Sequence, residues 1–313
     1  MSSTAALAHL TNLDANEALF FEQELEHIKA KTYDVMRREL RHREYVPVSN
    51  EAGPGAETIS YYQYDQVGTA KLISNYADDL PLANVKGKKF SAPVHSMGIG
   101  FAYSVQDIRA SQMANKRLEQ RDATAAARAV AELEESICAF GDANTGMLGF
   151  LNHPNVPIIQ AADPGGGRAW IADDKTPEEI TKDMGASVQS ILDTTSEKEK
   201  PNAIILPTLE YGHIAQTKMT SIEPTILKWF LTNNPWIQSV GTWDKLKTAD
   251  DAGTGPRMVT YRRDPDALQL EIPQEFEIFP VQQHNLVFLT PTHARIGGVS
   301  FFYPLSAVYT DDL

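Results

Sequence analysis

The chain has 313 residues, of which 42% are hydrophobic and 22% are charged, a composition typical of a soluble globular protein. No apolar run approaches the roughly 20 residues that span a bilayer, and the N-terminus lacks the pattern of a signal peptide, so we expect no membrane association. The net charge of -13 argues against a general nucleic-acid-binding protein, although a protein that encloses nucleic acid stays compatible with it. The single cysteine, Cys138, excludes an internal disulfide and a cysteine-based zinc site.

The first predicted element is a helix over residues 16–40, opened by a capping box of Asp14 and Glu17. Its end is basic, with Arg37, Arg38, Arg41 and Arg43. Positive charge at this end complements the helix dipole. The alternative is an arm that pairs with the acidic surface of a neighbouring subunit or contacts DNA.

Residues 50–100 carry little helical pattern. Ile59, Tyr61 and Gln63 alternate with a second set of side chains, which predicts a strand, and a second extended run covers residues 90–103. We interpret the whole as a long two-stranded excursion. Because an isolated two-stranded ribbon is marginal in water, either another chain covers it or it folds back on its own domain, and the spacing favours neither.

Residues 104–140 predict one long helix. Ser104 and Asp107 cap its start, no proline interrupts it, and Gly141 suits the left-handed position after its end. Such a helix would be about 50 Å long. One apolar stripe is expected from Ala126, Val130, Leu133, Ile137 and Phe140.

Three carboxylates, Glu132, Glu134 and Glu135, lie in the last turns of this helix, where their sign opposes the dipole. Either they are solvated, or cations from a neighbour or from the N-terminal arm offset them. A double-mutant cycle between Glu135 and Arg38 or Arg41 would test the second hypothesis.

The rest of the chain predicts an α+β unit followed by a strand-rich tail. A helix over residues 176–192 turns Ile180, Met184, Val188 and Ile191 inward. Further helices are expected over residues 208–219 and 222–231, and strands over residues 203–206, 237–243 and 258–262. Strands over residues 277–279, 286–290, 298–303 and 307–310 are expected to return and pack on the long helix.

Motifs for enzyme chemistry are absent from the sequence. Gly98-Ile99-Gly100 is better explained as a strand-to-helix hinge than as a dinucleotide fingerprint, and Gly165-Gly166-Gly167 as a loop. Asp78-Asp79 is expected at a loop tip, Cys138 as an inert thiol, and His284 and His293 as structural residues. We therefore predict no enzyme, with no catalytic, cofactor-binding or metal-binding residue.

Three stretches occur in an order that matches a known family: YYQYDQVGTAKLISNYADDLP (residues 61–81), residues 103–149 with the following Leu151-Asn152-His153-Pro154, and residues 272–308, which include ARIGGV at 294–299. On these stretches the chain resembles the major capsid proteins of tailed bacteriophages with the HK97-type fold, within a phage and prophage family long described as uncharacterised bacterial proteins. Residues 160–260 match least.

This resemblance implies an α+β HK97-like fold with four parts. They are an N-terminal arm (1–50), an extended E-loop hairpin (51–95), a peripheral domain (96–154 and 276–313) with a spine helix at 104–140, and an axial α+β domain (155–275).

The resemblance also implies a function: a structural protein that self-assembles into pentamers and hexamers of an icosahedral shell enclosing double-stranded phage DNA, without sequence-specific binding. Portal and scaffolding or decoration proteins are expected partners, and the location is the virion capsid, assembled in the bacterial host cytoplasm. Some members cross-link an E-loop lysine to an asparagine of the next subunit. Lys71, Lys86, Lys88 and Lys89 match by position only, and because the sequence identifies no acceptor, no cross-link is assigned. The chain begins almost directly with the arm helix, so any scaffold is expected to be separate or already removed.

Two alternatives remain from the sequence. The first is an encapsulin-like nanocompartment shell protein that holds a cargo enzyme. The second is a cytoplasmic α+β enzyme with a site in residues 155–275.

Overall fold

The computed structural model describes residues 36–68, 84–113, 118–163, 167–171, 175–220 and 224–313. The chain divides into two units, Met1–Glu39 and Leu40–Leu313, and the description below concerns the second. Most of the helix predicted at residues 16–40 lies outside the described residues, and residues 36–40 are not helical. The first described elements are a one-turn helix, α2 (His42–Tyr45), and a two-residue strand, β1 (Val48–Ser49).

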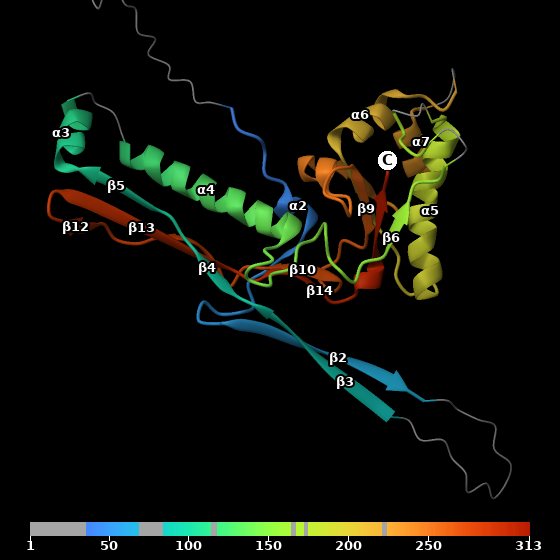
Figure 1. Ribbon diagram of the computed structural model, residues 1–313, viewed down its shortest axis with the longest axis horizontal. Helices are drawn as coiled ribbons and strands as arrows, with labels where there is room; N and C mark the ends of the chain where they lie inside the picture. Colours follow the sequence, from blue (N-terminus) through green and yellow to red (C-terminus); the bar gives the residue numbers. More distant parts are fainter. Residues whose placement is uncertain (1–35, 69–83, 114–117, 164–166, 172–174, 221–223) are drawn as a thin grey trace, which may run out of the picture. The chain divides into compact units, whose positions relative to one another are not determined.

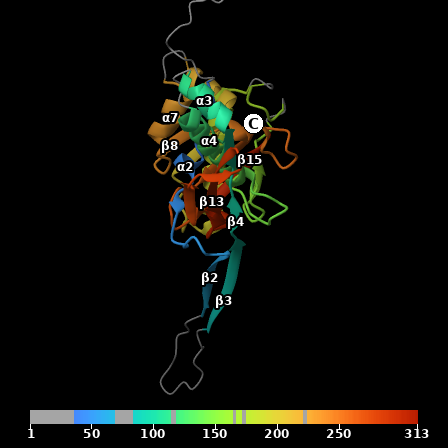
Figure 2. The same ribbon diagram turned by 90° about the vertical axis from the view of Figure 1, so that its left-hand side faces the viewer.

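A two-stranded hairpin follows, which confirms the predicted excursion. Strand β2 (Thr58–Val67) pairs antiparallel with β3 (Asn84–Pro93) over ten residue pairs, from Thr58 opposite Pro93 to Val67 opposite Asn84. The two strands form a sheet of their own, and in both Figure 1 and Figure 2 they extend away from the other sheets of the second unit. Residues 69–83, between the strands, lie outside the described residues.

Within residues 104–140, where one helix was predicted, the structure describes two helical stretches, α3 (Val105–Met113) and α4 (Leu118–Phe140), whose axes differ in Figure 1. Residues 114–117 lie outside the described residues. The predicted cap is confirmed, since the Asp107 N–H donates to Ser104 Oγ at 3.1 Å and the Ser104 N–H donates to Asp107 Oδ2 at 2.9 Å. Gly141 has the expected left-handed backbone, with φ +67°. At 23 residues, α4 is about 34 Å long rather than 50 Å.

The buried face of α4 differs from the predicted stripe at one position. Ala126, Val130 and Ile137 are buried as expected, but Leu133 is 46% exposed. Glu134 and Glu135 are buried instead. The face that packs inward is therefore partly acidic, which a search for apolar periodicity does not detect.

Strand β13 (Val287–Ile296) is the centre of a five-stranded antiparallel sheet. The strands that pair with it are β4 (His95–Met97), β5 (Gly100–Ser104), β11 (Gln274–Ile278) and β12 (Gln282–His284). Helix α4 contacts β5, β13 and β14 (Gly298–Phe301), which confirms that C-terminal strands return to it. Strand β14 also forms a three-stranded sheet with β10 (Leu268–Glu271) and β1.

A second five-stranded sheet has the order β6-β15-β9-β7-β8. Its strands are β6 (Ile158–Gln160), β7 (Ala203–Leu206), β8 (Ser239–Thr242), β9 (Arg257–Tyr261) and β15 (Ala307–Asp311). The last strand, β15, was predicted to return to the long helix; it lies in this sheet instead, between β6 and β9.

Three α-helices and two 3-10 helices accompany this sheet. They are α5 (Pro177–Thr195), α6 (Thr208–Gln216), α7 (Ile226–Asn233), η2 (Asp244–Thr248) and η3 (Pro304–Ser306). Helix α5 has the predicted inward face and a complete capping box between Thr176 and Glu179. Among the described helices, none combines the length and the apolar character that crossing a bilayer requires.

Candidate functional site

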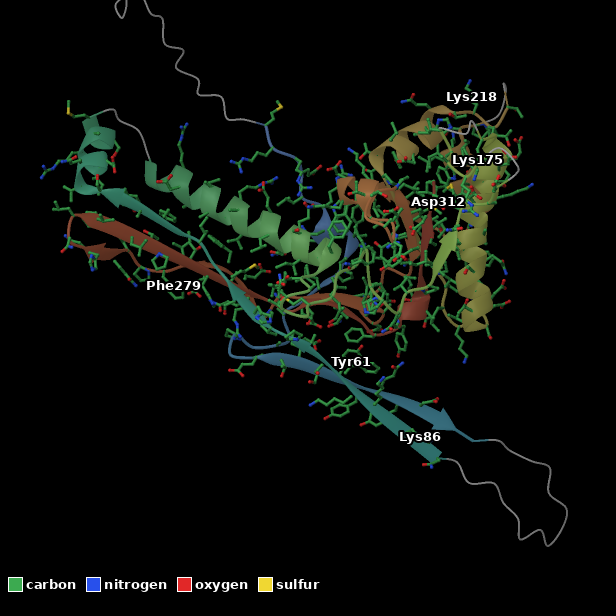
Figure 3. All side chains as sticks on the ribbon, in the orientation of Figure 1. Tyr61, Lys86, Lys175, Lys218, Phe279 and Asp312 are labelled. Carbon is green, nitrogen blue, oxygen red and sulfur yellow. The ribbon has the colours of Figure 1, made fainter. Side chains whose placement is uncertain are left out.

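Aromatic side chains attach the hairpin β2–β3 to the rest of the unit at the paired residues Tyr61 and Phe90, a region that we call the root of the hairpin. Tyr61 on β2 stacks on Phe90 of β3 with ring centroids 5.2 Å apart, and meets Phe302 edge to face at 4.8 Å. Its hydroxyl donates to the carbonyl oxygen of Phe301 at 3.1 Å, and burial raises its pKa. Because aromatic pairs of this geometry add to the energy of burial, Tyr61 fixes the root of the hairpin to the end of β14 (Figure 3).

Beyond this root, the hairpin exposes apolar and cationic side chains together. Tyr62 and Tyr64 are 60% and 65% exposed and stack with centroids 6.4 Å apart. Tyr64 covers Gly87, where a Cβ would lie 2.9 Å from its ring. The lysines of β3, Lys86, Lys88 and Lys89, are exposed as well, and Figure 3 shows Lys86 near the far end of the strand. Exposed aromatic surface beside charge is typical of a protein interaction site.

A groove of about 410 Å³ lies between the hairpin and the C-terminal strands. Tyr61 and Phe90 line one wall, and Phe301 and Leu305 line the other. His153 also lines the groove, and burial lowers its pKa to about 4, so its imidazole is neutral near pH 7. The lining is therefore mostly apolar and aromatic, as in sites that bind apolar groups.

A cluster of charged and polar side chains joins α2 to α4. Glu134 accepts from Arg43 Nε at 2.7 Å and contacts His42 Nε2 at 2.8 Å. Burial opposes the ionised form of Glu134, but the hydrogen bonds from His42 and Arg43 prevail and lower its pKa. Glu135 accepts from the Arg41 backbone N–H and from the Trp243 indole N–H, both at 3.2 Å. Arg43 of the N-terminal segment therefore offsets the charge of Glu134, as one of the two hypotheses states, and Glu134 and Glu135 are buried rather than solvated.

The residues considered for enzyme chemistry are not brought together. Cys138 is fully buried, and burial raises its pKa well above its usual value. His284 lies on β12 and His293 on β13, where His293 contacts Gln274 at 3.1 Å. Gly98 lies between the strands β4 and β5, so the strand-to-helix hinge predicted there is wrong. A Cβ at Gly98 would come within 2.4 Å of the Thr292 carbonyl oxygen, and this close approach of β13 accounts for the glycine.

Several of the other positions weighed from the sequence lie outside the described residues: Lys71, Asp78, Asp79, Gly165 and Gly166. Within the described ranges, no group of three or more His, Cys, Asp and Glu side chains could hold a metal ion.

Two buried ion pairs were not predicted from the sequence. Asp183 on α5 accepts from Lys175 Nζ at 2.8 Å and from the Trp170 indole N–H at 2.9 Å. Arg257 on β9 donates to both carboxylate oxygens of Asp311, at 2.6 and 2.7 Å. Asp183 interrupts the inward face of α5, and a charge at an inward helix position is the signal that would have identified it.

The structure is similar to solved structures of phages and of a virus-like particle. The capsid of Myoviridae phage XM1 superposes with a TM-score of 0.82 at 18% identity, covering 95% of this chain and 100% of that one. Mycobacterium phage Ogopogo gives a TM-score of 0.60 at 11% identity, with coverage of 95% and 100%. A virus-like particle from Pyrococcus furiosus gives 0.50 at 13% identity, with coverage of 85% and 90%. At these identities the likeness shows the fold.

The comparison by sequence is more specific. The chain finds no match among curated proteins. The model of the major capsid protein family, however, matches residues 68–313, which is well over half of the chain and includes α4, β13 and the sheet of β6-β15-β9-β7-β8. The chain therefore belongs to the major capsid protein family.

Proposed function

We propose that this protein is the subunit of an icosahedral phage shell, which it forms as pentamers and hexamers around double-stranded DNA. The observation that carries the proposal is the hairpin β2–β3. Its strands pair with each other over ten positions and form a separate two-stranded sheet, while Tyr62 and Tyr64 face solvent. Because such a ribbon gains little stability alone, a neighbouring copy that covers it accounts for its length and its exposed aromatic side chains.

The parts of the subunit follow from this proposal. Residues 51–95 act as the E-loop that lies over a neighbour, and residues 1–50 as the N-terminal arm. Residues 96–154 and 276–313 form the peripheral domain around α4, and residues 155–275 the axial domain at the capsomer centre. Contacts of this kind join different surfaces of identical chains and close into rings by rotational symmetry.

The role of the protein is structural and not enzymatic, and its location is the virion capsid. The shell assembles in the cytoplasm of the bacterial host, with a portal and with scaffolding or decoration proteins as partners. DNA is enclosed without sequence-specific contacts, in keeping with the net charge of -13. The nanocompartment alternative is not favoured, because the family model that matches is that of the major capsid proteins, and no observation favours an enzyme site in residues 155–275.

The experiment is electron microscopy of the purified chain beside a variant that lacks residues 56–90. We expect ring-shaped capsomers or closed shells from the intact chain, and a soluble, folded subunit without shells from the deletion. Normal particles from the deletion variant would overturn the assignment of the hairpin. Nuclease-resistant double-stranded DNA in particles from the producing cells supports the phage shell, whereas protein cargo without DNA would favour a nanocompartment.

A milder variant separates the exposed surface from the hairpin itself. Replacing Tyr62 and Tyr64 together by threonine keeps two residues that favour strands but removes the aromatic surface, and we expect far fewer shells. The control is Leu209→Thr, which changes a side chain that is 64% exposed on α6. Equal loss of shells in both variants would show that the effect is not specific to the hairpin.

A further inference from the structure

Residues 41–46 contact three parts of the second unit at once. They include α2, which lies beside the C-terminal end of α4 in Figure 1. Their buried contacts reach β8 and β9 of one five-stranded sheet, whereas their exposed contacts reach β11 of the other. The two kinds of contact differ in strength and in their response to salt.

The buried contacts centre on Tyr45. Its hydroxyl donates to the Thr242 carbonyl oxygen at 2.7 Å and accepts from the Thr242 N–H at 3.1 Å, and its own carbonyl oxygen accepts from the Tyr261 hydroxyl at 2.9 Å. The ring lies 5.8 Å from that of Trp243. A Cβ at Gly241 would come within 2.8 Å of the Tyr45 ring, so the fit leaves no space. Tyr45 therefore attaches α2 firmly to β8 and β9.

The exposed contacts centre on Arg43, which joins two carboxylates from different elements. Its guanidinium donates to Glu134 of α4 at 2.7 and 2.9 Å, and to Glu275 of β11 at 3.0 and 2.8 Å. We call this set of three residues the Arg43 bridge. Glu134 is buried and also held by His42, whereas Arg43 is 44% and Glu275 49% exposed. Exposed ion pairs are weak and are screened by salt, so the Glu275 end is the weaker end of the bridge.

The pairing of β11 with β13 is irregular around Glu275, which favours local opening of β11 there. Strand β11 pairs with β13 at Gln274 opposite Arg295 and at Glu277 opposite His293, with a register shift between them. A bulge of this kind leaves a residue outside the regular ladder, bends the strand and re-aims its side chains. Glu275 lies within the irregular stretch, so its contact to Arg43 replaces part of the support that a regular ladder would supply.

We propose that the Arg43 bridge is a releasable contact: opening its Glu275 end frees the irregular stretch of β11 around Glu275, while α2 stays attached to α4 through Glu134 and to β8 through Tyr45. The proposal concerns a single subunit.

The test is amide hydrogen exchange of the full chain at low salt and at about 1 M NaCl. In the unmodified chain we expect exchange over residues 274–278 to accelerate about two- to fivefold at high salt, as the loss of a weak exposed pair allows. Exchange over residues 239–242 should stay unchanged. In Glu275→Gln, residues 274–278 should exchange fast at both salt concentrations.

The matched control is Glu277→Gln, which removes the same charge from the same strand. Glu277 accepts from Gln274 at 2.8 Å and is exposed, and this variant should keep the salt response of the unmodified chain. Salt-independent exchange of β11 in the unmodified chain would overturn the proposal, as would an equal acceleration of β8. Because the readout is local opening within one subunit, it is independent of whether shells form.

Discussion

At the scale of single residues, Glu271 is a carboxylate whose burial disfavours its charged form. It is buried on β10, opposite Ser49 of β1 and Gly298 of β14. Burial raises the pKa of its carboxyl, hydrogen bonds from Ser300 and Ser49 act against that rise, and the nearby charge of Glu51 adds to it. The folded chain therefore favours the protonated form of Glu271.

The sign of the pH effect follows from that shift. Stability from protonated Glu271 is complete below the unfolded pKa of about 4.5 and is lost as the pH rises through the higher folded value. We expect Glu271→Gln to raise the free energy of unfolding by about 1 kcal/mol at pH 8 and to change it little near pH 4. Urea denaturation across this range measures the difference. A gain that does not vary with pH would contradict the assignment.

At the scale of elements, the end of α4 depends on an unusually close approach of the chain to itself. The N–H of Phe150 donates to the Cys138 carbonyl oxygen, and that of Leu151 to the Ala139 carbonyl oxygen, both at 2.8 Å. The returning segment thus satisfies carbonyl groups that a helix end leaves without intrahelical partners. A Cβ at Gly149 would lie 2.4 Å from the Phe140 carbonyl carbon, so only glycine fits there.

We therefore expect Gly149→Ala to destabilise the protein by several kcal/mol, about the cost of a strongly overpacked site. Because the atoms that the new Cβ would meet belong to the backbone, a side-chain rotation cannot relieve the clash. The control is Gly185→Ala in α5, where a Cβ meets nothing within 4 Å and where alanine favours the helix by up to about 1 kcal/mol. Thermal unfolding should separate the two variants in opposite directions, and a neutral Gly149→Ala would refute the requirement for glycine.

Elements with strong local signals were the predictable ones. The capping box at Thr176 and Glu179 and the apolar spacing from Ile180 onward predict α5, and the run of four apolar residues predicts β7. Strands β6 and β10 were missed because short strands are defined by their partners rather than by their own pattern. The different directions of α3 and α4 and the exposure of Leu133 were missed because helix propensity and apolar periodicity carry no information on tertiary contacts.

The candidate site divides in the same way. The hairpin was predictable, since the alternation along residues 58–64 indicates a strand with two differently used faces. The sequence does not indicate which face is which: Tyr61 contacts β14, whereas Tyr62 and Tyr64 face solvent. The contact of Glu134 with Arg43 joins residues 91 positions apart. Charge alone suggests that such a carboxylate needs a cation, but the fold decides which one.

At the scale of the whole second unit, one sheet separates two clusters of buried hydrophobic side chains. Along β7, Ala203 and Ile205 belong to the cluster that includes Phe150 and Trp243, whereas Ile204 and Leu206 belong to the cluster that includes Trp170 and Met184. Successive side chains of a strand point to opposite faces, so the sheet is the shared wall of both clusters. Unfolding of this sheet would therefore expose the buried side chains of both clusters.

This arrangement predicts that the two clusters unfold together. Ile204 and Ile205 are adjacent, equally buried and face opposite clusters, so Ile204→Ala and Ile205→Ala are matched variants. Each should lower the free energy of unfolding by about 2 to 5 kcal/mol, the usual cost of truncating a buried isoleucine. Because the sheet is common to both clusters, each variant should shift one transition that tryptophan fluorescence and far-ultraviolet circular dichroism report at the same denaturant concentration. Separate transitions, with each variant shifting only one of them, would mean that the clusters fold independently and that the sheet does not couple them.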